Sequence, residues 1–296
     1  MNDDLANKLE AIERRLAMIE RLATEIRGLV GPFGALLPDG RMLVQTLHGI
    51  KLYIDPLDLI MAPNLIVYRQ WEADVTALLL NALDRDTVFV DVGANIGYFT
   101  CLAGSIIGTQ GRGRVIAIEP NPACLALLDA NLIVNWSMCD IAVHRLAAAN
   151  FTGSAKLSIP SRRAPNAHLQ LDGTAADGEV CEVPVTTLDN LLPPDLAVDF
   201  MKIDVEGHEW SVLDGARSVI ERSPRLHILI EWSPGQMAAA GVASRTMIEL
   251  FRDLGLVAYP LPNALSQLAE EGVPLNANQL GATHYGNILL ARPAAA

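Results

Sequence analysis

The sequence is poor in positive charge. Its 296 residues contain 22 Lys and Arg against 34 Asp and Glu, which gives a formal net charge of −12. A surface that binds nucleic-acid phosphates needs clustered basic side chains, and here the basic residues are scattered along the chain. The composition therefore argues against a protein that binds nucleic acid.

Cysteine motifs and long apolar runs are also missing. The four cysteines, Cys101, Cys124, Cys139 and Cys181, form no CxxC pair and have no histidine at metal-ligand spacing. We expect them to be small buried residues in a reducing cytoplasm. No stretch reaches the roughly 18 apolar residues that cross a bilayer, and the N-terminus lacks the apolar core of a signal peptide. The sequence thus predicts a soluble, unprocessed protein without a membrane span.

Residues 1–32 have the pattern of an amphipathic helix. Apolar residues recur in alternating steps of three and four at Leu9, Ile12, Leu16, Ile19, Ala23 and Ile26. This spacing is typical of a coiled-coil seam, although a helix this short is only marginally stable alone. Two interpretations stay open: residues 1–30 pair two copies into a homodimer, or the helix folds back onto its own domain.

The rest of the chain divides into a β-rich extension, residues 33–86, and a larger domain, residues 87–296. The larger domain alternates strands with helices, which predicts a doubly wound, mostly parallel, Rossmann-like sheet of seven strands with its ligand at their carboxyl ends. The expected strands are 88–92, 114–119, 141–147, 199–204, 226–232, 256–261 and 285–291. The expected helices are 71–83, 97–107, 122–134, 208–222 and 244–254. Residues 160–181 are interpreted as a surface loop.

The stretch VFVDVGANIGYFT, residues 88–100, places two glycines in the first strand-to-helix turn. Gly93 and Gly97 allow a ligand to approach the backbone, and the helix start offers free N–H groups. A dinucleotide fingerprint needs a glycine where this chain has Asn95. Asp91, just before the turn, would repel a pyrophosphate but attract an ammonium or sulfonium group. This turn therefore suits a ligand with positive charge.

The second strand of the domain ends in Glu119-Pro120-Asn121. A carboxylate at this strand tip can accept both hydroxyls of a ribose that lies across the first turn, and Asn121 is placed to cap the following helix. Together with Asp91, these residues predict a site for an adenosine with a cationic tail.

Four stretches resemble one known family. DVGANIGYFT, IEPN, TTLDNLL and MKIDVEGHEWSVLDGA are similar to motifs of the FkbM family of S-adenosylmethionine-dependent methyltransferases, over about residues 71–293. The resemblance implies a class I methyltransferase fold, S-adenosylmethionine as cofactor, and a hydroxyl acceptor on a sugar, glycan or secondary metabolite. It assigns the methionine portion of the cofactor to Asp91, Gly93, Asn95 and Gly97, and the ribose to Glu119. We assign Pro120, Asn121 and Asp204 to the same cofactor site.

The reacting end is expected where two further strands finish. Asp204, Glu206 and His208 follow one strand and Glu231 ends the next, so the four side chains can converge. An alcohol must lose its proton to become a good nucleophile, and His208 is the favoured base because imidazole titrates near neutral pH. Alternatively, Asp204 and Glu231 ligate Mg²⁺, or Asp204 and Glu206 only cap a helix and bind cofactor. Trp71-Glu72 stands at a position that is often Trp/Tyr-Glu in the family it resembles, so Glu72 could line the site; a solvated first-turn glutamate is the favoured alternative.

Two other functions are alternatives to a methyltransferase. A nicotinamide-dependent oxidoreductase would also use a Rossmann sheet, but it would have to explain both Asn95 and Asp91. A noncatalytic, methyltransferase-like scaffold would keep the fold and assemble with partners through residues 1–30.

Overall fold

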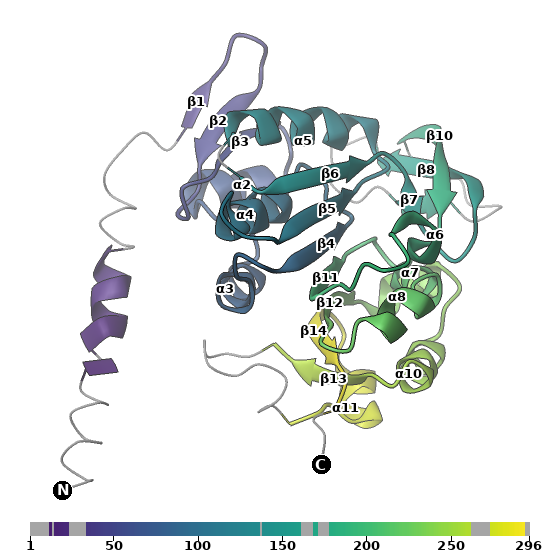
Figure 1. Ribbon diagram of the computed structural model, residues 1–296. Helices are drawn as coiled ribbons and strands as arrows, with labels where there is room; N and C mark the ends of the chain where they lie inside the picture. The colour runs from purple at the N-terminus through teal and green to yellow at the C-terminus, as the bar shows by residue number, and fades with distance from the viewer. Residues whose placement is uncertain are drawn as a thin grey trace, which may run out of the picture.

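The computed structural model shows an α/β protein built around one large sheet (Figure 1). It describes residues 12–13, 15–23, 34–136, 138–160, 168–170, 178–261 and 273–293. The large sheet has the strand order β13-β14-β12-β11-β4-β5-β6. Its strands are β4 Val88–Val92, β5 Arg114–Ile118, β6 Asp140–His144, β11 Phe200–Ile203, β12 His227–Trp232, β13 Val257–Pro260 and β14 Gly286–Ala291. Among these described strands only β14 runs against the others, so the expected fold class is confirmed.

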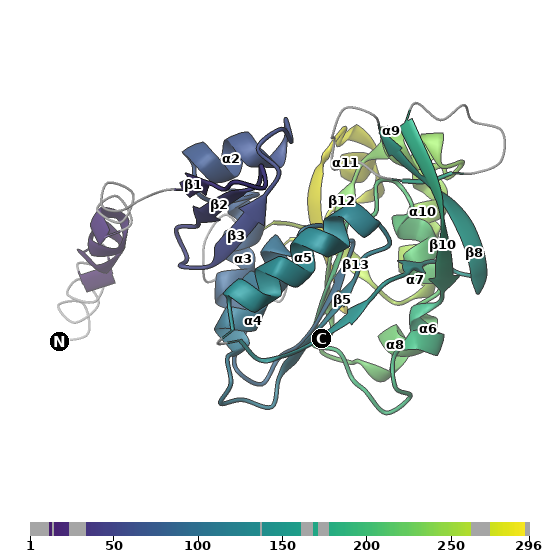
Figure 2. The same cartoon turned by 90° about the horizontal axis from the view of Figure 1, so that it is seen from above.

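Helices cover both faces of this sheet, and Figure 2 shows them as two layers. One layer contains α4 Tyr98–Ile107 and α5 Pro122–Val134, and the other contains α7 Glu209–Asp214, α8 Arg217–Arg222 and α10 Ser244–Asp253. Successive strand residues point to opposite faces: Phe89 and Phe200 pack in one apolar cluster, whereas Val90 and Met201 pack in the other. Strands buried on both faces must be apolar throughout, which explains the uninterrupted apolar runs in the sequence.

The single helix expected at 208–222 is wrong, because the structure has two short helices there. α7 ends at Asp214 and α8 begins at Arg217, with Gly215 between them. A Cβ on Gly215 would lie 2.1 Å from the carbonyl oxygen of Ala149, so the chain passes very close to a neighbouring segment at this point. Four other short helices among the described residues were not expected: α2 Met61–Val67, α6 Leu188–Leu191, α9 Pro234–Ala239 and α11 Ala277–Ala282.

The β-rich extension is a three-stranded antiparallel sheet followed by two helices. Its elements are β1 Gly34–Leu36, β2 Met42–Gln45, β3 Lys51–Ile54, α2 Met61–Val67 and α3 Ala73–Ala82. Gly40 and Gly49 have φ of 85° in the two hairpin turns. Apolar side chains of the extension pack in the same buried cluster as those of α4. The side-chain amide of Asn131 on α5 forms hydrogen bonds with the backbone of Tyr53 in β3 and with the carbonyl of Ile96 in the turn after β4. The extension therefore packs directly against the glycine turn.

A second, smaller sheet has the order β7-β10-β8-β9. Its strands are β7 Ala147–Ala148, β8 Gly153–Pro160, β9 His168–Gln170 and β10 Gly178–Thr186, and the short helix α6 Leu188–Leu191 follows. The interpretation of 160–181 as a surface loop is wrong in part, since β9 pairs with β8 and the start of β10 also belongs to the sheet. The backbone hydrogen bonds of these residues come from strand pairing. The intervening parts of that loop lie outside the described residues.

The N-terminal segment is helical at residues 12–13 and 15–23, and most of residues 1–32 lies outside the described part of the chain. Apolar side chains on this helix are exposed, including Ile12 at 52%, Leu16 at 53% and Ile19 at 60%. Of the helices among the described residues, none has the length and apolarity needed to cross a membrane.

Candidate active site

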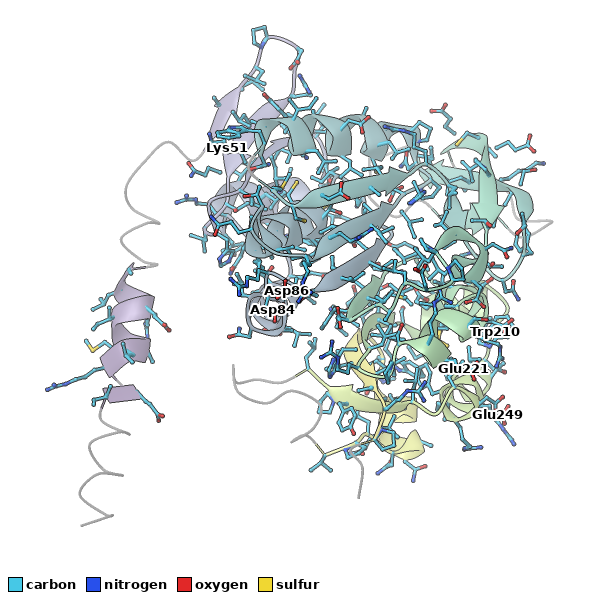
Figure 3. The ribbon with its side chains drawn as sticks, in the orientation of Figure 1. Lys51, Asp84, Asp86, Trp210, Glu221 and Glu249 are labelled. Atoms are coloured by element: carbon cyan, nitrogen blue, oxygen red, sulfur yellow. The ribbon has the colours of Figure 1, made fainter. Side chains whose placement is uncertain are left out.

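The site lies at the carboxyl ends of β4, β5, β11 and β12. Asp84 and Asp86 precede β4 and mark the opposite end of the sheet (Figure 3). In the glycine turn after β4, Gly93, Asn95 and Gly97 have φ of 79°, 52° and 85°. A Cβ on Gly93 would lie 1.9 Å from the carbonyl oxygen of Asp204. Both the left-handed backbone and the close packing of two turns therefore require glycine at this position.

Glu119 ties the glycine turn to the turn after β5. Its Oε2 accepts the N–H of Asn95 at 2.8 Å, and its Oε1 accepts the N–H of Asn121 at 2.7 Å. Burial raises the pKa of Glu119 to about 7, against the lowering effect of these two hydrogen bonds. Asn121 caps α5 as expected, since its side chain accepts the N–H of Ala123. Glu119 thus fixes the relative position of the two turns.

A cavity of ≈ 70 Å³, which we call the first cavity, opens between these turns. Six residues assigned from the sequence to the cofactor line it: Gly93, Asn95, Glu119, Pro120, Asn121 and Asp204. The remaining wall is largely apolar and includes Leu157 from the second sheet. Gly97 is not among the lining residues; a Cβ there would instead lie 2.2 Å from Cδ1 of Leu128 on α5.

Asp91 is fully buried and lines neither this cavity nor the next. Its Oδ2 accepts the Thr100 hydroxyl at 2.6 Å, while its Oδ1 has no hydrogen-bond partner in the described structure. Lys202 is its register partner on β11. The positive charge that Asp91 faces from within the protein is therefore Lys202, a residue that the sequence interpretation overlooked.

Lys202 is buried and forms an ion pair with Asp204, with Nζ 2.9 Å from Oδ2. Its ammonium group also lies 5.1 Å from the centre of the Phe99 ring. Although burial opposes the charge, Asp204, Asp91 and Glu72 together raise the pKa of Lys202. The lysine is therefore a permanent cation. Alternate strand residues share a face, so the Lys-x-Asp spacing was the signal that could have revealed this pair.

The second cavity, of ≈ 230 Å³, lies on the other side of Asp204. It shares Gly93, Asn95, Asp204 and Glu206 with the first cavity. Its other polar lining residues are Glu72, Lys202, Glu231, Gln236 and Tyr285, and its apolar lining includes Met61, Trp71, Tyr98 and Phe99. Of the four side chains expected to converge, Asp204, Glu206 and Glu231 do so here. His208 instead lines the first cavity.

Glu72 is not the solvated glutamate that we expected. It precedes α3 with φ of 38°, and its Oε2 is buried without a hydrogen-bond partner in the described structure. Thr76 fixes the backbone of residues 71–72, which we call the Glu72 corner, because its hydroxyl donates to the Trp71 carbonyl at 2.6 Å and its N–H donates to the Glu72 carbonyl. Burial raises the pKa of Glu72 to about 7, with Lys202 opposing the shift and Asp204 adding to it. The unusual backbone brings the carboxylate into the second cavity.

Glu231 forms another wall of the second cavity. It is the next-to-last residue of β12 and is 8% exposed, and its Oε2 has no hydrogen-bond partner among the described residues. Burial and the nearby Asp204 raise its pKa, while a hydrogen bond with Tyr285 and the charge of Lys202 lower it. Tyr285 precedes the antiparallel strand β14, which pairs with β12. The sequence could not show this neighbour, because the two strands are far apart along the chain.

Glu206 and Glu209 shape the turn between β11 and α7. Glu206 has φ of 55° and accepts a hydrogen bond from Nε2 of Gln236. Burial raises its pKa to about 8, with Asp204 adding to the shift. Glu209 accepts the N–H groups of Val205 and Gly207, both at 3.1 Å. It therefore holds this turn as Glu119 holds the first pair of turns, a role that the sequence interpretation did not assign.

The described residues contain no group of three or more His, Cys, Asp or Glu placed to hold a metal ion. The alternative Mg²⁺ site would use Asp204 and Glu231. An ammonium group already occupies the Asp204 carboxylate, with Lys202 Nζ 2.9 Å from Oδ2. Because two cations near one carboxylate repel each other, Lys202 opposes Mg²⁺ binding at this position.

Residues 91–257, which span most of both cavities, match the methyltransferase FkbM domain. The chain belongs to the FkbM methyltransferase family. A hexuronic acid methyltransferase, AglP from Haloferax volcanii, is 26% identical over 151 residues. That match covers 51% of this chain and 58% of the relative. Membership of the FkbM family favours the methyltransferase interpretation over the nicotinamide alternative.

Two of the solved structures that have a similar backbone serve as comparisons. One is TYW2 of Pyrococcus horikoshii in complex with MeSAdo, with 14% identity, a TM-score of 0.44, and coverage of 85% of this chain and 70% of that one. Another is precorrin-6y C5,15-methyltransferase of Geobacter metallireducens, with 17% identity, a TM-score of 0.40, and coverage of 75% and 88%. The assignment of a doubly wound, mostly parallel sheet rests on the order of its seven described strands.

Proposed function

We propose that this FkbM-family protein is an S-adenosylmethionine-dependent O-methyltransferase that acts on a hydroxyl of a sugar, glycan or secondary metabolite. The observation that carries the proposal is the meeting of two cavities at Gly93, Asn95, Asp204 and Glu206. One cavity suits a nucleoside and the other is large enough for part of an acceptor. The name of the AglP relative supports a sugar as acceptor.

The first cavity fits the nucleoside part of the cofactor. Each Glu119 oxygen accepts one backbone N–H, so each keeps a lone pair for a ribose hydroxyl. The apolar wall beside Ile118 and Leu157 suits an adenine ring. At the junction of the cavities, Asp204 and Glu206 would favour the positive end of the ligand. When bound, S-adenosylmethionine supplies a methyl group on a sulfonium sulfur that keeps the bonding electron pair as the methyl leaves.

The protein's residues would align the acceptor, exclude water and accept its proton. We propose that the proton goes to a carboxylate of the second cavity, and Glu72 is the favoured base. A group whose pKa lies near the working pH is best suited to this role, and burial brings the pKa of Glu72 to about 7. His208 lines the first cavity and not the second. If it were the base, the reacting hydroxyl of the acceptor would have to lie in the first cavity, beyond the shared residues Asp204 and Glu206.

Binding and turnover of the purified protein test this proposal. Isothermal titration should give micromolar affinity for S-adenosylhomocysteine and none for NAD(H); the reverse would revive the oxidoreductase alternative. The protein should then transfer labelled methyl groups from S-adenosylmethionine to small molecules or glycans in cell extracts, seen by mass spectrometry as products heavier by one methylene. Cofactor binding with no transfer to any extract would favour the noncatalytic scaffold.

We place this activity in a reducing compartment such as the cytoplasm. The proposal is supported by the four cysteines, which are all free thiols in the structure. Fractionation of cells that carry the tagged protein tests it, and recovery outside the cytoplasmic fraction would contradict it.

A further inference from the structure

Two residues that line the second cavity each have a carboxylate oxygen without a hydrogen-bond partner in the described structure. The two oxygens are Oε2 of Glu72 and Oε2 of Glu231, and both atoms are buried. Glu231 is 8% exposed as a whole residue, so its carboxylate has little access to bulk water. A buried acceptor without a donor is unfavourable, and a ligand that brings hydroxyl donors would relieve this cost. The pair therefore marks a binding position that the protein's own donors leave incomplete.

We propose that Glu72 and Glu231 form an acceptor subsite that takes an uncharged, hydroxyl-rich ring and discriminates against acceptors with a carboxylate or phosphate near the reacting hydroxyl. The inference rests on the proposed methyltransferase function and deepens it by naming the acceptor class. Each carboxylate oxygen can accept a hydrogen bond from a hydroxyl group, so two carboxylates that line one cavity suit a compound with several hydroxyl groups.

The charges of the cavity favour a neutral acceptor over an anionic one. Among the described lining residues Lys202 is the only Lys or Arg, and its ammonium is already paired with Asp204 at 2.9 Å. Sites for carboxylates and phosphates in proteins rely on Arg or Lys side chains directed at the ligand. An anionic acceptor would instead meet Glu72, Asp204 and Glu231. The hexuronic acid named for the AglP relative would therefore be a poor acceptor here.

The apolar side of the cavity suits the C–H face of such a ring. Trp71, Tyr98 and Phe99 all line it. Tyr98 is held in place by Thr76, whose hydroxyl lies 3.2 Å from the tyrosine oxygen. Thr76 also fixes the Glu72 corner, so the aromatic wall and the carboxylate are fixed by one side chain. A cavity lined by both aromatic rings and carboxylates matches a ring with apolar faces and a hydroxyl-bearing edge.

Matched acceptors test the inference. Methyl glucoside, methyl galactoside and methyl mannoside are compared with the corresponding methyl uronides, 6-phosphates and 2-amino sugars, with initial rates of methyl transfer from labelled S-adenosylmethionine as the readout. We expect the neutral sugars to be preferred at least tenfold in kcat/KM over the anionic forms of the same ring. An anionic sugar used equally well, or an amino sugar preferred over the neutral one, would overturn the inference.

Variants identify the residues responsible. Glu72→Gln and Glu231→Gln should each lower kcat/KM for neutral sugars at least tenfold. They should also lower the ratio of kcat/KM for neutral sugars to kcat/KM for the methyl uronides. Glu221→Gln is the matched control, because Glu221 is an exposed residue of α8 (Figure 3). Unchanged selectivity in both cavity variants would reject the subsite.

S-adenosylhomocysteine titration of every variant separates the two proposals. The cavity variants should bind it as the unaltered protein does, which also shows that they are folded. If the unaltered protein fails to bind S-adenosylhomocysteine, the proposed function is wrong. If it binds but methylates no neutral sugar of the panel, the inferred acceptor class is wrong and the cofactor assignment stands.

Discussion

The first and second cavities differ in how the chain builds them. The first is formed mainly by the ends of β4, β5 and β11, and its central carboxylate, Glu119, is engaged by backbone N–H groups on both oxygens. The second adds residues from the N-terminal extension, from β12 and from the segment before β14. Two of its carboxylates, Glu72 and Glu231, keep an oxygen without a partner in the described structure.

This difference fits the roles that we propose for the two cavities. A cofactor that is the same in every reaction can be held by turns whose hydrogen bonds are complete before it arrives. An acceptor is bound by side chains whose hydrogen bonds the acceptor itself completes. The extension, residues 34–82, is therefore part of the proposed acceptor site through Met61, Trp71 and Glu72.

The largest expected effect concerns the junction of the two cavities. Gly93→Ala would place a Cβ 1.9 Å from a backbone oxygen at a φ of 79°. We expect it to destabilise the fold by about 3–5 kcal/mol or to prevent folding, measured by denaturant unfolding. Gly281→Ala is the matched control: it lies in α11 with no atom within 4 Å and should stabilise by about 0.5–1 kcal/mol. Equal stability of the two variants would contradict the packing account of the turn.

The next effect separates the two proposed bases. Glu72→Gln should lower kcat by roughly 10²-fold with little change in S-adenosylhomocysteine affinity, whereas His208→Ala should lower kcat less than about tenfold. Stopped assays at saturating cofactor measure both. The opposite ranking would restore His208 as the base and place the acceptor in the first cavity.

The pH dependence sharpens this test. Glu72 acts as a base only when ionised, so kcat/KM for the acceptor should rise with pH and then level off. The midpoint of this rise should lie at or below pH 7, because the pKa of Glu72 is about 7 in the protein without cofactor. The positive charge of bound S-adenosylmethionine would lower this pKa further. Glu72→Gln should remove the rise. If kcat/KM still rises with pH in Glu72→Gln, the rise belongs to another group, such as Glu231.

A smaller effect is expected from removal of divalent metal. Because Lys202 already occupies the Asp204 carboxylate, methyl transfer should proceed at its full rate in EDTA. A rate that falls in chelator and recovers with Mg²⁺ would show that Asp204 and Glu231 hold a metal instead. Lys202→Met in the same assay separates the roles of the ammonium and the metal.

The smallest effect on catalysis is expected at the N-terminal helix. Its exposed Ile12, Leu16 and Ile19 lie on one stripe of a coiled-coil pattern, and we propose that they pair with a second copy of the chain. Deletion of residues 1–30 should convert a dimer into a monomer in light scattering, while kcat stays within about twofold of its original value because neither cavity includes this helix. An unchanged mass would reject the pairing.

The sequence predicted the large sheet and most of the first cavity because both depend on local patterns. The apolar run before Asp91, the glycines at 93 and 97, and the acid at 119 lie within one strand–helix–strand unit. Their positions at the strand tips follow directly from the fold class. The structure adds a second reason for these glycines, because a Cβ at Gly93 would meet Asp204 and a Cβ at Gly97 would meet Leu128.

The second cavity was only partly predictable. Asp204 and Glu231 were recognised because both end strands that are neighbours in a parallel sheet. The solvated position favoured for Glu72 was wrong, since a left-handed backbone before a helix has no signature in the sequence, whereas the Trp/Tyr-Glu pattern of the family did indicate a lining residue. Tyr285 depends on the pairing of β12 with β14. Lys202 was overlooked although its ion-pair partner, Asp204, lies only two residues along the chain. The other acids that raise its pKa, Asp91 and Glu72, come from other segments.

The affinity of S-adenosylhomocysteine for two variants tests the division into cofactor and acceptor cavities most directly. Titration calorimetry should show that Glu119→Ala weakens binding by roughly 10–100-fold, through loss of the ribose contact and of the bonds that join the two turns. Glu72→Gln should bind within about threefold of the unaltered protein, since its carboxylate lines only the second cavity. Equal losses in both variants, or a loss in Glu72→Gln alone, would contradict the account.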